Sequence, residues 1–305
     1  MTMQQELEEA VGRVADSVGP AVVRIGRGWG RGAGVVIAEG TVLTNAHNLR
    51  GAETTVTFAD GRAATAAVTG IDADGDLAVL SVDTAGAPAV RWDPAAVAPR
   101  LGTPVFAVAN PAGQGLRVTF GLVSAVGQAF RGPRGRRIAG SLEHTAPLNR
   151  GSSGGPIVDG TGALLGINTN RVGDGFYLAL PTDADLKARI DALARGESPS
   201  RPRLGVALAP AHATRRLRAA VGLPERDGLL VRGVQDGSPA AAAGIRQGDL
   251  LVAAGGRPLA SQDDLYAALE SVEPGAGLEL SVVRGVEELA VNVDFAVEHS
   301  DHADV

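Results

Sequence analysis

Short apolar runs, separated by glycine-containing turns at spacings near ten residues, are the feature that most constrains this chain. The runs are rich in β-branched residues, which is typical of β-strands. We expect strands at 21–25, 34–37, 41–44, 54–58, 63–71, 77–82, 104–109, 118–126, 163–168 and 175–180. Many short strands joined by frequent turns indicate a β-barrel or a β-sandwich, so the fold is predicted to be mainly β.

The pattern changes before and after this region. Apolar residues at helical spacing near the start predict a short amphipathic helix, which packs on its own domain or, less favoured, contacts another subunit. A polar, proline-containing segment near residue 200 is typical of a linker, and short strands alternate with two helices after it. The expected organisation is a helix at 1–20, a first domain at 21–196, a linker at 197–203, a second domain at 204–296 and a polar tail at 297–305.

Composition argues against several functional classes. The net charge of −6 argues against general nucleic-acid binding, and the lack of cysteine excludes disulfides and thiolate metal sites. No cofactor or metal site is predicted. No apolar run approaches the ~18 residues of a membrane span. Residues 1–10 do not resemble a secretory signal, so we expect a cytoplasmic location, or a periplasmic or other extracytoplasmic one if the true start lies upstream.

A serine lies between glycines in the segment 149–156, which reads Asn-Arg-Gly-Ser-Ser-Gly-Gly-Pro. Glycine adopts backbone angles that a β-carbon forbids, so this turn can expose the hydroxyl of Ser153 while backbone N–H groups converge beside it. A serine nucleophile with an oxyanion hole is built in this way. The alternative is an ordinary turn, because serine and glycine are common in hairpins. A base and an acid elsewhere in the chain decide between the two interpretations.

Two residues can supply that base and that acid. His47 directly follows an apolar strand, and Asp76 directly precedes the apolar run 77–80. Each alone is more commonly structural than catalytic. The chain order His47, Asp76, Ser153 is, however, the order found in chymotrypsin-like enzymes. Together the three residues predict a catalytic triad.

Four motifs resemble the HtrA family of serine proteases. They are Thr-Asn-Ala-His at 44–47, Asp-Leu-Ala-Val-Leu at 76–80, Asn-Pro at 110–111 and Gly-Ser-Ser-Gly-Gly-Pro at 151–156. The resemblance covers about residues 10 to 295, and the second unit resembles a bacterial PDZ domain. It implies a chymotrypsin-like double β-barrel followed by a small α+β PDZ domain. It also implies an ATP-independent serine endopeptidase of protein quality control, acting on unfolded or misfolded proteins as a homotrimer.

The resemblance assigns roles to the site residues. Ser153 would attack the scissile carbonyl, His47 would take its proton and pass it to the leaving amine, and Asp76 would orient the imidazole. The N–H groups of Gly151 and Ser153 would form the oxyanion hole, with the peptide at Ser152 shaping its loop. The competing hypothesis is a chaperone-like or scaffold peptide-binding protein whose triad is weakly active or inactive.

This chain departs from the family pattern at several positions. Ser152 stands where asparagine is usual in the family, and Thr145 stands where aspartate is usual. The loops that activate the site can therefore have a different conformation in this chain. The neighbouring His144 is a candidate second histidine of the site, although a surface or packing role is favoured. The loop before Gly32 is short, which argues against regulation by a long loop. The first 25 residues contain no aromatic residue, although the family's N-terminal contacts are often aromatic.

Specificity can also be predicted by resemblance. The expected pocket residues are Pro147, Leu148, Ile167, Asn168, Thr169 and Asn170. None of these residues is acidic, so we expect an apolar pocket for small aliphatic side chains.

The second unit carries a predicted peptide-binding groove. Its segment 203–206 resembles the loop with which PDZ domains bind a C-terminal carboxylate, and the next strand and a helix would complete the groove. The predicted groove residues are Leu204, Gly205, Val206, Ala207, Leu208, Leu265 and Leu269. The alternative is that they form only a core.

A cluster of basic residues lies in a Gly/Pro-rich segment, at Arg131, Arg134, Arg136 and Arg137. We interpret it as a solvated loop in preference to an anion-binding site.

Overall fold

The computed structural model describes residues 2–27, 32–111, 114–132, 137–198, 202–209, 216, 219–220, 226–273 and 275–295. The predicted tail at 297–305 and two of the clustered arginines, Arg134 and Arg136, lie outside these ranges. The chain divides into two compact units, with the boundary along the sequence between residues 199 and 200, and each unit is described by itself.

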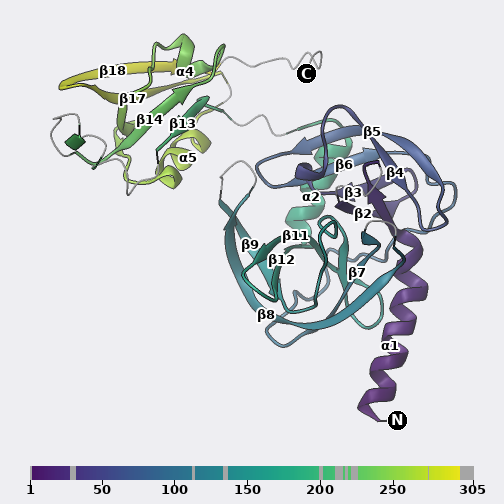
Figure 1. Cartoon of the computed structure of the whole chain (residues 1–305). Coiled ribbons are helices and arrows are strands. Elements are labelled where there is room, and N and C mark those ends of the chain that lie inside the picture. Colours follow the sequence, from purple (N-terminus) through teal and green to yellow (C-terminus); the bar gives the residue numbers. More distant parts are fainter. Residues whose placement is uncertain are drawn as a thin grey trace. The chain divides into compact units, whose positions relative to one another are not determined.

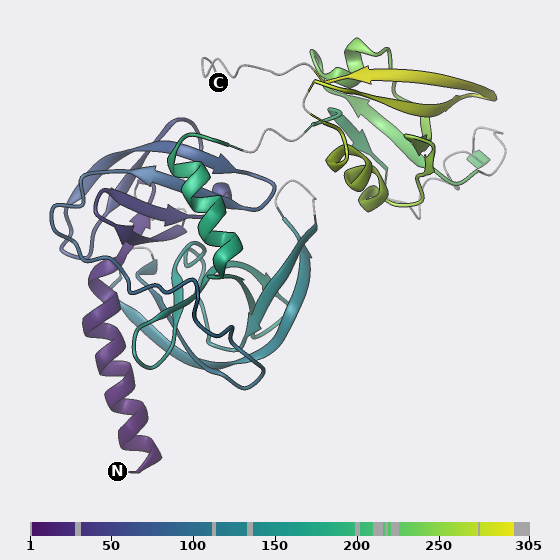
Figure 2. The ribbon, with the colours of Figure 1, turned by 180° about the vertical axis from the view of Figure 1, so that it is seen from behind.

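Two closed six-stranded barrels make up most of the first unit (Figures 1 and 2). The first barrel has the order β1-β2-β3-β6-β5-β4, with β1 (Val22–Ile25), β2 (Gly32–Ala38), β3 (Thr41–Thr44), β4 (Glu53–Thr57), β5 (Ala63–Asp72) and β6 (Leu77–Ser81). The second has the order β10-β11-β12-β9-β8-β7, with β7 (Pro104–Ala109), β8 (Arg117–Arg131), β9 (Arg137–His144), β10 (Pro156–Val158), β11 (Leu164–Val172) and β12 (Phe176–Pro181). The predicted mainly β, double-barrel fold is confirmed.

Two helices pack against these barrels. Helix α1 (Met3–Val18) begins with a capping box between Thr2 and Gln5 and is followed by the short 3₁₀ helix η1 (Gly19–Ala21). It buries Ala10, Val14 and Val18, whereas its first turn projects away from the barrels in both views. Helix α2 (Ala184–Ala194) begins at Asp183, whose side chain accepts a hydrogen bond from the N–H of Leu186. It buries Leu186, Ile190 and Leu193.

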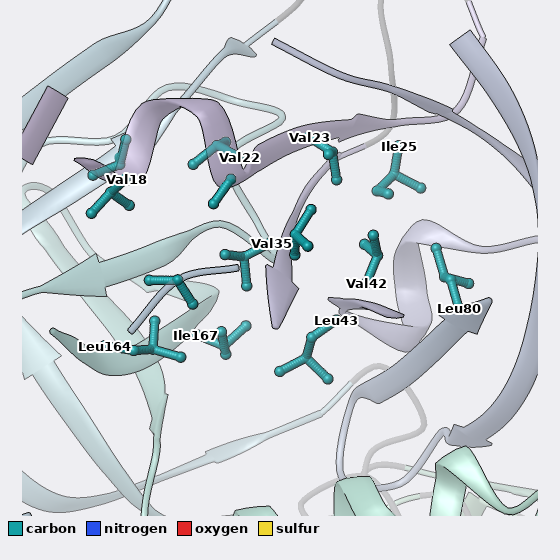
Figure 3. Packing of buried hydrophobic residues seen from close by; sticks show 14 of the residues in the cluster. Val18, Val22, Val23, Ile25, Val35, Val42, Leu43, Leu80, Leu164 and Ile167 are labelled. Atoms are coloured by element: carbon teal, nitrogen blue, oxygen red, sulfur yellow. The ribbon is translucent and has the colours of Figure 1, made fainter. Parts of the chain in front are cut away.

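One apolar cluster holds the barrels together. It includes buried residues of α1, both barrels and α2. Figure 3 shows Val35 and Leu43 of the first barrel beside Leu164 and Ile167 of the second. Each such side chain stabilises the fold by about 1.5–3 kcal/mol when fully buried. Side chains that come from different barrels are therefore held at fixed positions relative to each other.

Within its described residues, the second unit contains a six-stranded sheet and the helices α4 and α5. The strands follow the order β13-β14-β15-β17-β18, and β16 pairs with β15. Its elements are β13 (Val206–Leu208), β14 (Leu229–Val234), α4 (Pro239–Ala242), β15 (Leu250–Ala254), β16 (Arg257–Pro258), α5 (Gln262–Glu270), β17 (Gly277–Arg284) and β18 (Glu287–Asp294). This unit has its own core, in which Leu265 and Leu269 of α5 pack with Leu204.

Candidate active site

His47 lies directly after β3, in the one-turn 3₁₀ helix η2 (Ala46–Asn48). Its Nδ1 is 2.9 Å from both carboxylate oxygens of Asp76, and its backbone N–H donates to Asp76 Oδ1 at 3.1 Å. Because a carboxylate only accepts hydrogen bonds, the proton of the neutral imidazole lies on Nδ1. Nε2 is then free to accept a proton, as a general base requires.

Asp76 is almost completely buried, with 1% of its surface exposed. Thr169 Oγ1 donates to its Oδ2 at 2.6 Å, and the side chain of Asn45 donates to its backbone carbonyl at 2.9 Å. Its φ of 53° is in the left-handed region, which is uncommon outside glycine but tolerated by aspartate. Strain of this kind persists where surrounding contacts fix the backbone, and it is concentrated at functional sites. The contacts hold the carboxylate in one orientation toward the imidazole.

Ser153 lies on the loop between β9 and β10. Its carbonyl accepts hydrogen bonds from the N–H of Ala33 at 2.8 Å and from the side chain of Asn48 at 2.9 Å, which ties the loop to the first barrel. Its hydroxyl donates to the carbonyl of Thr169 at 3.1 Å. In the described part of the chain, no hydrogen bond joins this hydroxyl to His47. Thr169 therefore connects two residues of the predicted triad, because its hydroxyl contacts Asp76 and its carbonyl contacts Ser153.

The residues before Ser153 form a tight turn. The N–H of Ser152 donates to the carbonyl of Asn149 at 3.3 Å, and Gly151 has a φ of 86°. A positive φ at the third residue, after a residue with negative φ, defines a type II turn and favours glycine there. Among the described residues, the N–H groups of Gly151 and Ser153 have no hydrogen-bond acceptor. Both predicted oxyanion-hole donors are thus unpaired in this conformation.

The predicted specificity residues divide into two groups. Pro147 and Leu148 line a pocket of about 200 Å³ with residues of β7 and β8. Residues 167–169 are buried in β11 and take part in the core and in the hydrogen bonds around the triad, whereas Asn170 is exposed. That the two groups line one specificity pocket stays a prediction.

His144 is completely buried at the end of β9. Its Nε2 is 2.8 Å from Asn168 Oδ1, and its ring stacks on Tyr177 with a centroid separation of 5.7 Å. The Asn168 amide donates to the carbonyl of Gly155 at 3.0 Å. Gly155 ends the segment 149–155, which we call the nucleophile loop because it carries the predicted nucleophile Ser153. Burial lowers the pKa of His144, against the opposing effects of the Asn168 hydrogen bond and of Glu143. The favoured packing role agrees with this burial, but the sequence did not predict the link to the nucleophile loop.

The predicted peptide groove of the second unit has the geometry of an open sheet edge. Strand β13 pairs only with β14 among the described strands, so its other edge is unpaired. Both views place β13 beside α5 (Figures 1 and 2). Gly205 has a φ of 78°, and a β-carbon there would lie 2.2 Å from the Ser238 β-carbon. The N–H groups of Leu204 and Gly205 have no acceptor among the described residues, so they can bind a carboxylate.

The described residues contain neither a cluster of metal ligands nor a membrane-spanning helix. No group of three or more His, Cys, Asp or Glu side chains is placed to hold a metal ion in the described ranges. Among the helices of the described residues, none is long and apolar enough to cross a membrane.

Comparison with protein families gave two matches. Residues 32–167 match the trypsin-like peptidase domain, and residues 202–295 match the PDZ domain. The putative serine protease HhoA of Synechocystis is 34% identical over 281 residues, which cover 88% of this chain and 71% of HhoA. Serine endoprotease DegS of Escherichia coli K12 is 31% identical, with 86% and 75% covered. The probable periplasmic serine endoprotease DegP-like of Brucella suis is 35% identical over 89% of this chain and 53% of its own length.

Solved structures similar to this chain are also serine proteases. The HtrA-type protease AlgW with a decapeptide superposes with a TM-score of 0.64 at 25% identity, over 94% of this chain and 98% of AlgW. The serine endoprotease from Yersinia pestis has a TM-score of 0.63 at 28% identity, over 94% and 97% of the two chains.

Proposed function

This chain belongs to the HtrA family of serine proteases, and we propose that it is an ATP-independent endopeptidase that cleaves unfolded or damaged proteins. The observation that carries the proposal is the connected set His47, Asp76, Thr169 and Ser153, in which the imidazole and the carboxylate are 2.9 Å apart. Residues from the two barrels form this set, as a double-barrel protease requires.

In the proposed reaction, Ser153 Oγ attacks the scissile carbonyl carbon while His47 Nε2 takes the hydroxyl proton. The C–N bond then breaks, and His47 gives this proton to the leaving amine. Water attacks the resulting acyl-enzyme, again with His47 as the base, and releases the acid and the free serine. Asp76 stabilises the imidazolium that forms in each half of the reaction.

The oxyanion that forms in each step needs hydrogen-bond donors. We propose that the unpaired N–H groups of Gly151 and Ser153 supply them, since both belong to the nucleophile loop. Loss of one such donor typically costs about 3 kcal/mol of transition-state stabilisation. Glycine at position 151 matters here because its positive φ sets the orientation of the turn.

We further propose that the substrate residue before the cleaved bond has a small aliphatic side chain, bound by the predicted specificity residues. A peptide library cleaved mainly after lysine or arginine would contradict this preference.

The second unit is proposed to recruit substrates or regulatory peptides through their C-termini. The unpaired edge of β13 and the free N–H groups of Leu204 and Gly205 support this role. A peptide would extend the sheet beside β13 and place its carboxylate at these N–H groups. Amidation of the peptide C-terminus should therefore weaken binding to the whole chain by at least about tenfold.

A homotrimer is proposed on the family resemblance. The first turn of α1, which projects from the barrels, offers a surface for subunit contacts. Light scattering should give three times the 30.9-kDa chain mass, and a monomer at micromolar concentration would contradict the proposal.

A second candidate function is a peptide-binding chaperone or scaffold with an inactive triad. It is favoured by one contact, the hydrogen bond from the Ser153 hydroxyl to Thr169 in place of one to His47. Hydrogen bonds between catalytic groups are, however, often long or misaligned without substrate and tighten on binding.

Cleavage of unfolded casein distinguishes the two functions. The wild-type chain should degrade casein without ATP, and Ser153→Ala should not, with a loss on the order of a million-fold in turnover. A fluorophosphonate probe should label the wild-type chain and leave both Ser153→Ala and His47→Ala unlabelled. Equal behaviour of wild type and Ser153→Ala in both assays would favour the binding protein.

A further inference from the structure

We propose that Arg189 of α2 and Asp72 of β5 are positioning residues for the predicted catalytic acid Asp76. This inference rests on the proposed function, because Asp76 belongs to the proposed triad. Asp72 and Leu77 pair opposite each other in the β5–β6 hairpin, and the turn 73–76 joins them. Asp76 is the last residue of this segment, which we call the acid turn, so the direction of its side chain depends on how the acid turn is held.

Asp72 accepts two hydrogen bonds that fix the acid turn. Its Oδ1 accepts from the backbone N–H of Gly75 at 2.8 Å, and its Oδ2 accepts from Arg189 Nη2 at 2.7 Å. The same nitrogen of Arg189 is 3.4 Å from the carbonyl oxygen of Gly75, the residue directly before Asp76. The ion pair therefore contacts both polar backbone groups of Gly75, and with them the peptide bond that leads into Asp76.

Burial makes this ion pair important for the acid turn. Asp72 is 2% exposed, whereas 36% of the Arg189 side chain is exposed. A buried carboxylate is unfavourable unless a cation and hydrogen bonds compensate for its lost hydration. Without the guanidinium, the acid turn would have to rearrange to bring the Asp72 carboxylate into contact with water.

Gly75 leaves the space that the ion pair occupies. A β-carbon at this position would overlap with Arg189 Nη2 and with Asp72 Oδ2. The φ of Gly75 lies outside the left-handed region, so the ion pair, and not the backbone conformation, excludes alanine here. The guanidinium therefore packs directly against the acid turn.

Helix α2 holds the guanidinium at a fixed place. The helix packs against β5 and β6 (Figure 2), and Ile190 and Leu193 are buried in the apolar cluster of the first unit. Two residues before Asp72, a β-carbon at Gly70 would overlap with the carbonyl oxygen of Leu193. The backbone of α2 thus lies directly against the end of β5, and Arg189 reaches the acid turn from a rigid element.

The ion pair restrains the backbone on one side of Asp76, and Asn45 restrains it on the other. The Asn45 side chain donates to the carbonyl of Asp76 at 2.9 Å. Asp76 has a φ of 53°, a conformation that persists only where surrounding contacts hold it. If the acid turn relaxed, the carboxylate would turn away from His47, and a misplacement of about 1 Å can cost about 100-fold in rate. Arg189 and Asp72 therefore act through Asp76 and touch no reacting atom.

Proton NMR of the full-length Ser153→Ala protein tests the inference without catalysis. The Nδ1 proton of His47 lies in a charge-assisted hydrogen bond to Asp76, which moves its signal far downfield and slows its exchange with water. Arg189→Met should make this exchange at least about tenfold faster, because a hydrogen bond to a charged group is worth a factor of about ten or more.

Kinetics with Ser153 present give a second readout. Arg189→Met should lower kcat for a peptide substrate by about 100-fold, because the acid is misplaced. KM should stay within about twofold, because Arg189 contributes no substrate binding. Arg189→Lys keeps a cation within reach of Asp72 and should restore most of the kcat. A fall in kcat that lysine does not restore would mean that the charge at position 189 has no positioning role.

Lys187→Met is the matched control. Lys187 also lies on α2 and pairs with Asp191 of the same helix, so this change removes a cation from α2 without touching the acid turn. It should leave the proton signal and kcat unchanged. Equal effects of Arg189→Met and Lys187→Met, or an unchanged signal in Arg189→Met, would overturn the inference.

Gly75→Ala decides the matter if thermal unfolding shows that Arg189→Met does not fold. It displaces the guanidinium while both charges stay in the chain, and it should weaken the same proton signal; an unchanged signal would overturn the inference. Absence of the downfield signal from the Ser153→Ala protein itself would contradict the proposed triad, and this inference with it. A signal that is present there and insensitive to both changes would overturn the inference alone and leave the proposed protease activity standing.

Discussion

In the proposed reaction, much of the chemistry depends on the side chain of Asp76. Its oxygens face three donors: the ring N–H and the backbone N–H of His47, and the hydroxyl of Thr169. The carboxylate therefore selects the imidazole tautomer with its proton on Nδ1, and only this tautomer leaves Nε2 as a base for Ser153.

Asp76→Asn should keep the shape of the site and remove most activity. The amide would donate to His47 Nδ1, so the ring proton would move to Nε2 and no base would face Ser153. We expect turnover of a peptide substrate to fall by about 10⁴-fold at neutral pH, as the equivalent change does in triad enzymes. Thermal unfolding of the variant serves as the control for its fold. A loss of less than tenfold in a folded variant would mean that Asp76 does not orient the base.

Gly154 fixes the nucleophile loop against the first barrel. Its φ is 90°, and a β-carbon at this position would lie 2.1 Å from the carbonyl oxygen of Ala33 and 2.7 Å from Thr44 Oγ1. Gly154→Ala should destabilise the first unit by about 3 kcal/mol, since backbone strain and overpacking act together. Gly173→Ala is a matched control with a φ of 63° and nothing within 4 Å, and it should cost only about 1 kcal/mol. Urea unfolding measures both, and equal effects would contradict this account.

At the scale of elements, the sequence pattern did not predict β9, nor the short strands β10 and β16, and β9 is the longest of the three. Residues 137–144 contain arginine, glycine and glutamate in place of a continuous apolar run, and they follow a basic segment that resembles a loop. The strand forms because β8 and β12 pair with its two edges. Pairing of this kind depends on tertiary structure, so local composition does not reveal it.

The candidate site, like the fold, was predictable from the sequence only in part. Glycine turns and chain order pointed to His47, Asp76 and Ser153 because those signals are local in the sequence. The double contact of Thr169 was not predictable, since it depends on how β11 of the second barrel is placed relative to Asp76 of the first. The bond between His144 and Asn168 joins β9 to β11, and no sequence spacing encodes that distance.

His144 gives β9 a pH-dependent contribution to stability. Because burial lowers its pKa in the folded state, the unfolded chain binds a proton first as the pH falls. The stability associated with neutral His144 is therefore complete above the ordinary histidine pKa of about 6.5 and decreases below it, until the pH reaches the lower folded-state value. The decrease is at most about 1.4 kcal/mol per pH unit for one group.

His144→Gln should reduce this dependence, since its amide can replace the hydrogen bond to Asn168 without titrating. The loss of unfolding free energy between about pH 7.5 and 5.5 should be smaller in the variant by about 1 kcal/mol. An unchanged pH profile in His144→Gln would assign the acid sensitivity to other groups.

At the scale of the whole molecule, the two units have separate apolar cores. The clusters of the first unit contain residues of α1, α2 and the two barrels, whereas those of the second contain only residues from Leu204 onward. A unit with its own core can fold alone. We therefore expect two transitions in calorimetric unfolding of the Ser153→Ala protein. A chain ending at residue 198 should fold and show only one of these two transitions.

With Ser153 present, this shortened chain should react with the fluorophosphonate probe within about threefold of the full-length rate, because every residue of the proposed triad and oxyanion hole lies before residue 170. It should also lose all binding of C-terminal peptides, since Leu204 and β13 are absent. A folded but unreactive shortened chain would mean that the second unit helps to form the nucleophile loop, whereas an unfolded one would mean that the two cores are not independent.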